Sequence, residues 1–454
     1  MGRYFGTDGI RGRYEGALLN ANFVRRVGFG LKDHLRKMNA GKPLCVVLGR
    51  DTRQSGEWLE KALLEGLTSG GIHVYRLDQV PTPAVSMMVR DLNADLGIML
   101  TASHNPPEDN GIKLFDRQGL KLEDEEEAAI EAAIDAAALP DHSPVSLPSG
   151  YAYDGRGYYM NYIRSLLHQN CLWDWKVVID TANGATCETT PAVFRHLGAT
   201  IVCLGCKPDG HNINVDVGSE HPEALCKRVR KEKAHLGLAH DGDGDRLVVC
   251  DEKGHILAGE ELLGIIGLHY LSHGQLKQNT LVTTVHSNTG LDKVLADHGG
   301  KVIRTPVGDR HVLHAMLQTG SNFGGESSGH YLFTDNSCCG DGLLTAIKLI
   351  EVMLASGRPL SELRHQIKLF PQAGLNVRVA TKPPIESLPT LFPAIQSVEE
   401  KLAGKGRVLV RYSGTESKLR LLVEAPRPAT ARQCLKVLEA AAQKDLTVLP
   451  SATA

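Results

Sequence analysis

Short apolar runs alternate with amphipathic segments along most of the chain. The runs are rich in β-branched residues, as in strands that a sheet buries on both faces, and they lie at residues 44–48, 96–100, 177–179, 236–239 and 281–285. The segments between them have the periodicity of amphipathic helices, at residues 56–67, 222–233, 260–271 and 341–355. Strand and helix in alternation predict an α/β architecture with mixed, mostly parallel sheets.

The last part of the chain has a different pattern. Its apolar runs and helical stretches follow the order strand, helix, strand, strand, helix, at residues 375–379, 386–401, 408–412, 419–423 and 430–444. This order predicts a smaller α+β domain rather than another doubly wound sheet. The final residues, 450–454, are expected to form a loose tail.

The same local pattern occurs three times in the sequence. A predicted strand, a polar turn and then a predicted helix follow one another from Val47, from Val178 and from Val282. Strand-turn-helix units are common, so the three units could also be unrelated to one another. The distance between them along the sequence is about that of a domain, which favours three related α/β domains. A length of 454 residues likewise suggests several domains. We expect domains at residues 1–150, 151–252, 253–370 and 371–454.

Composition narrows the class of protein. A net charge of −2 supplies no long-range field for nucleic acid or an anionic membrane, so phosphate recognition must be local. No stretch approaches the roughly 20 apolar residues of a membrane span, and residues 1–11 lack a signal core. The ten cysteines show no paired zinc spacing, and the adjacent Cys338 and Cys339 are poorly placed to bridge. We therefore expect a reduced, cytoplasmic protein with neither nucleic acid nor membrane as partner.

A first candidate site is TASHNPPEDNGIK at residues 101–113. It follows a buried strand, at the edge of the sheet where open α/β folds bind ligands, and it exposes Ser103 on a constrained loop ahead of Lys113. A plain connecting turn is the alternative. Neighbouring residues on an extended segment point to opposite sides, so we expect His104 to be a positioning residue and not to take the proton of Ser103.

A second candidate site is AHDGDGDR at residues 239–246. Asp241, Asp243 and Asp245 stand at alternate positions, and the glycines between them let the backbone fold around an ion. Three carboxylates with open positions suit Mg²⁺. A calcium-binding EF-hand loop is excluded, because its sixth position would be Arg246 instead of glycine and an apolar strand fills its second half.

A third candidate site is GGESSGH at residues 324–330. Glu326 and Ser328 can hydrogen-bond to sugar hydroxyls or to an amine, and the glycines allow close approach. His330 is a candidate general acid or base, although a histidine after a glycine-rich turn is often an ordinary loop residue.

A fourth candidate site is RYSGTESKLR at residues 411–420, between two predicted strands. Arg411, Ser413 and Thr415, with the backbone N–H groups around Gly414, would form a compact cradle for an anion. A hairpin turn is expected at the same place. The arginine beside two hydroxyl residues favours phosphate as the ligand.

Taken together, the four motifs resemble those of the α-D-phosphohexomutase superfamily, in the same order and with one motif in each predicted domain. The resemblance extends over essentially the whole chain and implies three related α/β domains and a smaller fourth domain around a central cleft. It implies a catalytic phosphoserine at Ser103 and a Mg²⁺ held by its phosphate and the three aspartates. It also implies proton transfer by Lys113 and His330, with Arg11 and Arg246 as the arginines that follow the N-terminal loop and the aspartate loop.

Details at the two ends of the chain resemble one subfamily, the phosphoglucosamine mutases. The opening RYFGTDGIRG at residues 3–12 and the SGTE at 413–416 are similar to theirs. Ser417 departs from the pattern, because this subfamily usually has proline there, and the loss of a proline relaxes the turn. Ser327 is a second departure, in a position where relatives often differ.

The resemblance implies a phosphoryl transfer between O6 and O1 of a hexosamine phosphate, through Ser103 and a 1,6-bisphosphate intermediate that turns over within the site. The product would feed UDP-N-acetylglucosamine and cell-wall synthesis. The loop from Arg411 would hold the distal phosphate, and Arg11, Lys113 and His330 share the role of acid or base. Three alternatives stay open: a phosphomannomutase/phosphoglucomutase, a phosphatase that uses Ser103, and a non-catalytic sugar-phosphate-binding protein. The choice between a monomer and a homodimer is also open.

Overall fold

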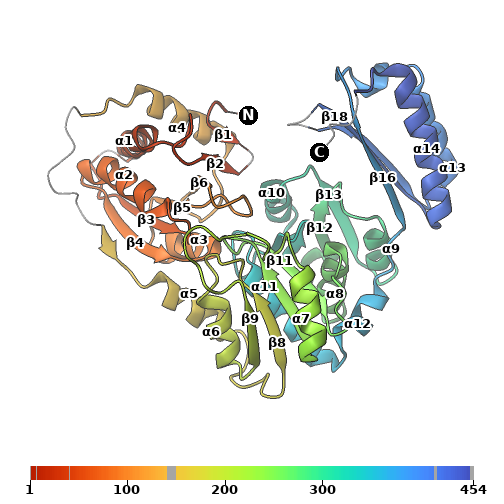
Figure 1. Cartoon of the computed structure of the whole chain (residues 1–454), viewed down its shortest axis with the longest axis horizontal. Coiled ribbons are helices and arrows are strands. Elements are labelled where there is room, and N and C mark those ends of the chain that lie inside the picture. The colour runs from red at the N-terminus through yellow and green to blue at the C-terminus, as the bar shows by residue number, and fades with distance from the viewer. Residues whose placement is uncertain (1, 7, 40, 141–149, 414–416, 450–454) are drawn as a thin grey trace. The chain divides into compact units, whose positions relative to one another are not determined.

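The structure is a computed structural model that describes residues 2–6, 8–39, 41–140, 150–413 and 417–449 (Figure 1). The chain divides into two compact units. Unit 1 consists of Met1–His286 and His298–Gln366, and unit 2 of Ser287–Asp297 and Ile367–Ala454. In the described part of the chain the strands form four sheets, three of them in unit 1.

The first sheet of unit 1 has the strand order β1-β2-β6-β5-β3-β4-β7. Its strands are β1 (Phe5–Gly6), β2 (Gly9–Arg13), β3 (Cys45–Arg50), β4 (His73–Gln79), β5 (Leu96–Leu100), β6 (Asp109–Phe115) and β7 (Tyr151–Ala152). The helices of this part are α1 (Ala21–Met38), α2 (Gly56–Ser69), α3 (Thr82–Asp91), α4 (Asp124–Ala136) and α5 (Gly155–Arg164). Strand β5 pairs in parallel with β3 and antiparallel with β6, so the sheet is mixed. Helix α1 packs against α2 and α4, and α3 packs against β3 and β5 (Figure 1).

The second and third sheets have the orders β11-β10-β8-β9 and β13-β12-β14-β15. Their strands are β8 (Lys176–Asp180), β9 (Thr200–Leu204), β10 (Leu236–His240), β11 (Leu247–Asp251), β12 (Thr280–Thr284), β13 (Lys301–Thr305), β14 (Phe323–Gly325) and β15 (Tyr331–Phe333). Their helices are α6 (Thr189–His196), α7 (Glu223–Glu232), α8 (Gly259–Ser272), α10 (Asp309–Thr319), α11 (Gly342–Ser356) and α12 (Leu360–Leu363), with 3₁₀ turns at η1 (Lys277–Asn279) and η2 (Arg364–Gln366). In both sheets the central pairs are parallel and one edge pair is antiparallel.

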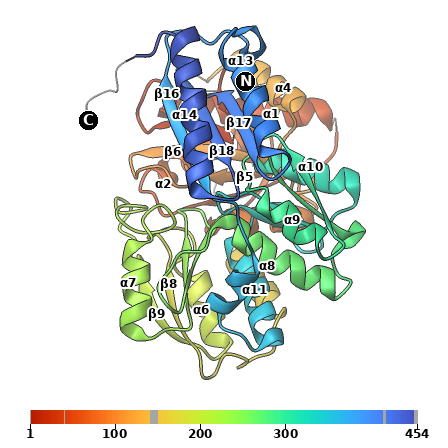
Figure 2. The ribbon, with the colours of Figure 1, turned by 90° about the vertical axis from the view of Figure 1, so that its right-hand side faces the viewer.

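Unit 2 contains an antiparallel sheet with the order β16-β18-β17. Its elements are α9 (Gly290–Ala296), β16 (Gln372–Arg378), η3 (Ile385–Ser387), α13 (Leu391–Leu402), β17 (Arg407–Tyr412), β18 (Lys418–Glu424) and α14 (Pro428–Asp445). Helices α13 and α14 lie side by side on this sheet (Figure 2). Their apolar faces and alternate strand residues make a separate hydrophobic core that includes Leu391, Val398, Leu421 and Leu438.

The predicted fold class is confirmed, because three α/β sheets precede an α+β layer. The predicted strand at residues 96–100 coincides with β5, and several other boundaries differ by one or two residues. The helix predicted at 386–401 starts later, at Leu391. Pro389 precedes it, and a proline inside a helix removes a hydrogen bond and clashes with the preceding turn. The chain before Pro389 therefore forms only the 3₁₀ turn η3.

Among the helices that the structure describes, none is both long and apolar enough to cross a lipid bilayer. All ten cysteines lie in described positions, and each is a free thiol.

Candidate active site

Ser103 lies on a tight turn directly after β5, and its backbone is in the left-handed region with φ of 54°. This conformation costs a non-glycine residue about 1–2 kcal/mol, so other contacts must hold it. The backbone N–H of Ser103 donates to Thr101 Oγ1 at 2.9 Å. Its carbonyl accepts hydrogen bonds from Arg53 Nη2 at 3.0 Å and from Asn214 Nδ2 at 2.8 Å. Side chains from two other loops therefore fix the turn.

The side chain of Arg53 holds the loop that follows β5, residues 101–109, which we call the serine loop. The guanidinium is fully buried, and its Nε donates to Asp51 Oδ2 at 2.9 Å. Its Nη atoms donate to backbone carbonyls of the loop, including those of Asn105 and Asp109 at 2.8 Å. Burial raises the pKa of Asp51 although Arg53 opposes that shift. The ion pair is thus a buried scaffold, in which each charge needs its partner.

The expectation that His104 points away from Ser103 is wrong. Ser103 Oγ lies 3.2 Å from His104 Nδ1, because the left-handed backbone at Ser103 brings the two side chains to the same side. An extended backbone, which the expectation assumed, would have separated them. Burial, and after it the charge of Arg246, lowers the pKa of His104. His104 is therefore placed, as a neutral imidazole, to exchange a proton with the hydroxyl.

Three buried aspartates converge in the loop between β10 and β11. One carboxylate oxygen from each of Asp241, Asp243 and Asp245 lies within 4.8 Å of the other two. Ser103 Oγ donates a hydrogen bond to Asp241 Oδ2 at 2.7 Å. The turn needs glycine at Gly244, which has φ of 75°. The structure thus brings the first and second sequence motifs together at one point.

The aspartate cluster fits a hard divalent cation. Asp243 Oδ1 is buried and accepts no hydrogen bond from the residues that the structure describes. Burial and the charges of Asp243 and Asp245 raise the pKa of Asp241 well above its usual range, which shows how strongly the cluster needs a counter-charge. Carboxylate oxygens are the ligands that Mg²⁺ prefers. The residues present therefore suit that ion.

Lys113 supplies part of the counter-charge from β6. Its buried Nζ lies 2.7 Å from Asp243 Oδ2, 2.9 Å from Asp245 Oδ2 and 3.1 Å from Asp8 Oδ2. Although burial disfavours the charged form, these carboxylates raise the pKa of Lys113 well above its usual range. Thr82 adds a neutral contact, since its Oγ1 donates to Asp243 Oδ2 at 2.6 Å. Lys113 therefore stays an ammonium in this site.

The carboxylate of Asp8 connects the cluster to a second set of charges. Asp8 also pairs with Arg11 and with Lys121, whose Nζ lies 2.7 Å from Asp309 Oδ2. Burial favours the neutral acid, but Lys113 and Lys121 lower the pKa of Asp8 well below its usual range. Arg11 was singled out from the sequence, whereas Asp8, Lys121 and Asp309 were missed. Asp8 lies within the opening motif at residues 3–12, but the motif did not reveal its ionic partners, and Lys121 and Asp309, the first residue of α10, belong to no motif.

His330 and Arg246 complete the charged cluster. His330 Nε2 lies 3.1 Å from Asp245 Oδ1 and 3.3 Å from Arg246 Nε, and its Nδ1 lies 3.4 Å from Glu326 Oε2. Burial disfavours the imidazolium, but Asp245 outweighs burial and raises the pKa of His330 to about 10. The backbone N–H of Arg246 donates to Asp241 Oδ1 at 3.2 Å. The third motif thus meets the first two in unit 1.

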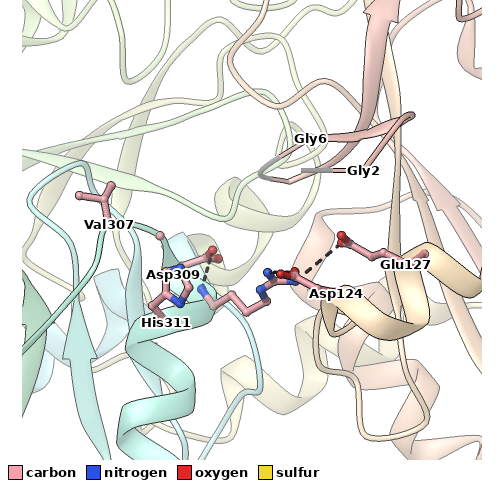
Figure 3. Close-up of a pocket in the computed structure, with 10 residues that line it drawn as sticks. Gly2, Gly6, Asp124, Glu127, Val307, Asp309 and His311 are labelled. Carbon is pink, nitrogen blue, oxygen red and sulfur yellow. Dashed lines mark hydrogen bonds and ion pairs between the residues drawn. The ribbon is translucent and has the colours of Figure 1, made fainter. Parts of the chain in front are cut away.

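The loop before α10 contacts Glu326 and also lines a cavity of about 380 Å³ (Figure 3). Glu326 Oε1 accepts a hydrogen bond from the backbone N–H of Gly308 at 2.9 Å, while Ser328 is exposed nearby in the sequence. The cavity is lined by Gly2, Gly6, Asp124, Glu127, Ala128, Val307, Gly308, Asp309, Arg310 and His311. Asp309 belongs both to this wall and to the charged cluster. A small polar ligand in the cavity would therefore lie beside the cluster.

The fourth motif lies in unit 2, where β17 and β18 form a hairpin. Arg411 stands opposite Arg420 in the strand register, and like charges in that relation repel. Burial and the neighbouring Arg420 lower the pKa of Arg411. The carbonyl of Ser413 accepts a hydrogen bond from Lys382 Nζ at 2.7 Å. Gly414 and Thr415 lie outside the described residues. The described part of the hairpin therefore brings Lys382 and Arg420 to Ser413, with Arg411 opposite Arg420.

Four family models cover most of the chain. They are the α/β/α domains I, II and III of phosphoglucomutase/phosphomannomutase, at residues 2–140, 158–254 and 258–370, and the C-terminal domain of the same family, at 375–441.

Curated relatives match at full length. A phosphoglucosamine mutase of Nitratidesulfovibrio vulgaris is 42% identical over 449 residues, which is 98% of this chain and 99% of the relative. The phosphoglucosamine mutase of Myxococcus xanthus is 43% identical over 450 residues, 98% of each chain.

Solved structures share the fold. A phosphoglucomutase/phosphomannomutase family protein from Burkholderia thailandensis matches with a TM-score of 0.81, at 24% identity, over 98% of both chains. The N-acetylphosphoglucosamine mutase of Aspergillus fumigatus, solved with GlcNAc-6P and magnesium, matches with a TM-score of 0.65, at 18% identity, over 98% of this chain and 96% of the other.

Proposed function

Because the chain belongs to the phosphoglucomutase/phosphomannomutase family, we propose that it interconverts glucosamine 6-phosphate and glucosamine 1-phosphate, with Ser103 as the phosphoserine. The choice of a hexosamine rests on full-length relatives at 42% and 43% identity that are phosphoglucosamine mutases. The role of Ser103 rests on one observation above all. Its hydroxyl lies 2.7 Å from a buried carboxylate within a cluster that suits a divalent cation.

Asp241, Asp243 and Asp245, with the phosphate on Ser103, are the proposed ligands of Mg²⁺. When bound, this ion would offset the charge of the phosphate and polarise its P–O bond. The protein contributes the remaining positive charge itself. Lys113 and Arg246 lie against the aspartates, so they can stabilise the oxygens of a phosphoryl group in transfer.

The first half-reaction breaks the bond between phosphorus and Ser103 Oγ and forms one between phosphorus and the free sugar hydroxyl, so that the sugar hydroxyl loses a proton and Ser103 Oγ gains one. The second half-reaction breaks the bond between phosphorus and the other sugar oxygen and re-forms the one to Ser103 Oγ, so that Ser103 Oγ loses a proton and the sugar oxygen gains one. Arg11, Lys113 and His330 are the proposed proton-transfer residues from the sequence. Asp245 contacts His330 and raises the pKa of its imidazole, which supports His330 as a candidate acid. His104, 3.2 Å from Ser103 Oγ, is a further candidate for the proton of the serine.

The proposed sugar contacts are Glu326 and Ser328. Glu326 is held by the N–H of Gly308, on the loop that also lines the cavity of Figure 3. At about 380 Å³, the cavity has the size of a site for a small ligand. The wall carries charges of both signs, because Asp124 and Glu127 pair with Arg310 and Asp309 pairs with Lys121.

The proposed contacts of the distal phosphate are Arg411, Ser413, Gly414 and Thr415. Repulsion between the opposed Arg411 and Arg420 would be relieved by a bound anion. A second phosphate site is needed because the 1,6-bisphosphate intermediate must return its other phosphate to Ser103. A hydrolase has no such need, which argues against the phosphatase alternative.

The product glucosamine 1-phosphate is proposed to feed UDP-N-acetylglucosamine and cell-wall synthesis. The cytoplasmic location stays a prediction, and the choice between a monomer and a homodimer stays open.

Turnover of three substrates tests the proposal. Glucosamine 6-phosphate, mannose 6-phosphate and glucose 6-phosphate are compared by kcat/KM, with the matching 1,6-bisphosphate as activator and inorganic phosphate release measured in parallel. We expect the amino sugar to have the highest kcat/KM and phosphate release to be a minor path. Faster conversion of a neutral sugar would contradict the substrate, and phosphate release without isomerised sugar would favour a phosphatase.

A further inference from the structure

A buried histidine joins the two ends of the loop that carries the three aspartates, residues 241–246. His240 is the last residue of β10, directly before Asp241, and its side chain is fully buried. His240 Nδ1 lies 3.2 Å from the carbonyl oxygen of Arg246, at the other end of the loop. A carbonyl oxygen can only accept, so Nδ1 carries the hydrogen and donates it. One hydrogen bond therefore closes the loop on both sides of the proposed Mg²⁺ ligands.

The second ring nitrogen fixes the orientation of the imidazole. With the hydrogen on Nδ1, a neutral ring offers Nε2 as an acceptor, and Thr190 Oγ1 lies 3.0 Å from it. Thr190 is the second residue of α6 and is fully buried, so its hydroxyl can donate to Nε2 without competition from bulk water. The ring of His240 is thus held at both nitrogens, between α6 and the carbonyl of Arg246.

The N-terminus of α11 packs against the same contact. The backbone N–H of Gly342 donates to the carbonyl of Gly244, within the loop, at 3.0 Å. A Cβ at Gly342 would overlap the carbonyl oxygen of Arg246 and lie 2.6 Å from His240 Nδ1, so there is no room for a side chain. The backbone of the loop is therefore held at two places, by His240 at its ends and by α11 at Gly244.

The ends of the loop carry groups that the proposed reaction needs. Asp241 follows His240 directly, and its Oδ1 accepts a hydrogen bond from the backbone N–H of Arg246 at 3.2 Å. The Nε of Arg246 lies 3.3 Å from His330 Nε2. A change in the separation of the loop ends would therefore displace a metal ligand and a phosphoryl contact together. Loss of a group that orients metal ligands commonly lowers metal affinity or activity by about 10- to 100-fold.

We propose that His240 is a positioning residue for the metal site, because its hydrogen bond to the Arg246 carbonyl holds the three aspartates at the spacing that binds Mg²⁺. It acts through the backbone of the loop and is not itself one of the proposed ligands. This inference rests on the proposed function, which supplies those ligands. The residue stands inside the motif AHDGDGDR, where its type alone gives no sign of such a role.

Two substitutions separate the roles of the ring nitrogens. His240→Asn keeps an amide N–H near the position of Nδ1, where it can donate to the Arg246 carbonyl. His240→Gln places its amide near the position of Nε2, where it can reach Thr190 but not Arg246. Both variants lose the ring, so a merely structural role would affect them alike. Mg²⁺ affinity is measured by calorimetric titration of full-length proteins with matched Ser103 phosphate content, and urea unfolding in EDTA measures stability.

We expect His240→Gln to weaken Mg²⁺ binding by about 10- to 100-fold. At a fixed Mg²⁺ concentration its kcat should fall, while the KM for the sugar phosphate changes little. His240→Asn should recover most of the Mg²⁺ affinity. The proposal is overturned if the two variants bind Mg²⁺ equally well, or if both keep the affinity of the unmodified protein.

A milder pair of variants tests the same contact if a change at His240 prevents folding. Thr190→Val removes only the hydroxyl that orients the ring, so it should weaken Mg²⁺ binding by about 2- to 10-fold, as for one neutral hydrogen bond. Thr190→Ser should restore the affinity. Thr189→Val removes the adjacent buried hydroxyl, whose partner is the Thr186 carbonyl, and should leave the affinity unchanged. Equal affinities in Thr190→Val and Thr189→Val would also overturn the proposal.

The Mg²⁺ measurement separates this inference from the proposed function. Equal affinities in all variants, together with normal turnover of the amino sugar, would remove the role of His240 and leave the function standing. Conversion of a neutral hexose phosphate would change the substrate and leave the comparison of affinities as it is. An unmodified protein that binds no Mg²⁺ would refute the metal site and the role of His240 together.

Discussion

The hydroxyl of Ser103 donates a hydrogen bond to Asp241 Oδ2 across 2.7 Å, although 138 positions separate the two residues in the sequence. A phosphate on this hydroxyl would carry about −1.5 to −2 charge beside three buried carboxylates. Such a concentration of negative charge is stable only with compensating cations. Phosphorylation of Ser103 and binding of a divalent ion should therefore reinforce each other, because each favours the other by the same free energy.

Replacement of Ser103 by alanine should remove both the covalent phosphate and the activity. We expect Ser103→Ala to lose the phosphate-sized increment in intact mass and to lower kcat by at least ~10³-fold, since no other group can carry the phosphoryl. Ser272→Ala changes an exposed hydroxyl at the end of α8 and should keep both properties. A mass increment that persists in Ser103→Ala would place the phosphate elsewhere.

Magnesium should stabilise the protein through the aspartate cluster. A ligand that binds only the folded state at about 100 times its Kd adds about 2.7 kcal/mol, so Mg²⁺ should raise Tm and EDTA should reverse the rise. Asp243→Asn should abolish this shift, because it removes a charged ligand whose Oδ1 has no other described partner. Asp335→Asn removes a surface carboxylate and is the control. An equal Mg²⁺-dependent shift in both variants would contradict the assigned ligands.

The buried guanidinium of Arg53 should matter more for stability than any surface arginine. Arg53→Met leaves Asp51 buried without its partner and frees several carbonyls of the serine loop, which we expect to cost about 3–5 kcal/mol. Arg156→Met removes a partly exposed pair with Glu188 and should cost about 0–1 kcal/mol. Urea unfolding of both variants measures the difference. Similar midpoints would mean that the Arg53 network does not hold the loop.

Local patterns in the sequence predicted the fold because each element carries its own signal. The alternation of apolar runs and amphipathic stretches marked β5 and the helices α2, α7, α8, α11, α13 and α14, and Pro389 accounts for the misplaced start of α13. The alternate aspartates from Asp241 were visible for the same reason, since their spacing within one loop suffices to suggest a cation.

Contacts between distant loops could not be predicted in this way. Asn214 reaches the site from a loop without a motif, and Asp8 lies within the opening motif at residues 3–12, but only the folded chain shows their partners. The error at His104 came from a backbone angle, because no rule of alternation applies once Ser103 adopts a left-handed conformation.

The hairpin of unit 2 should bind the phosphate group of the substrate. Hydrogen bonds to a charged group contribute about 1.5–3 kcal/mol, so Arg411→Ala should raise KM by about 10- to 100-fold. The phosphate content of Ser103 should stay the same. Arg427→Ala, at an exposed position before α14, serves as the control. A fall in kcat at constant KM would instead assign Arg411 a part in the chemical step.

Glu127 in the wall of the cavity should make stability depend on pH (Figure 3). Burial, reinforced by Asp124 and opposed by Arg310, raises its pKa from the usual value of 4.5 to about 7. Between these two values the folded chain holds a proton that the unfolded chain has lost, so this group's contribution to stability falls as pH rises through about 7. Glu127→Gln should therefore stabilise the protein more at about pH 8 than at about pH 5, in urea unfolding at both. Glu125→Gln changes an exposed carboxylate of the same helix and should show no such trend. If Glu127→Gln gave the same gain at both pH values, the carboxyl would not titrate in this range.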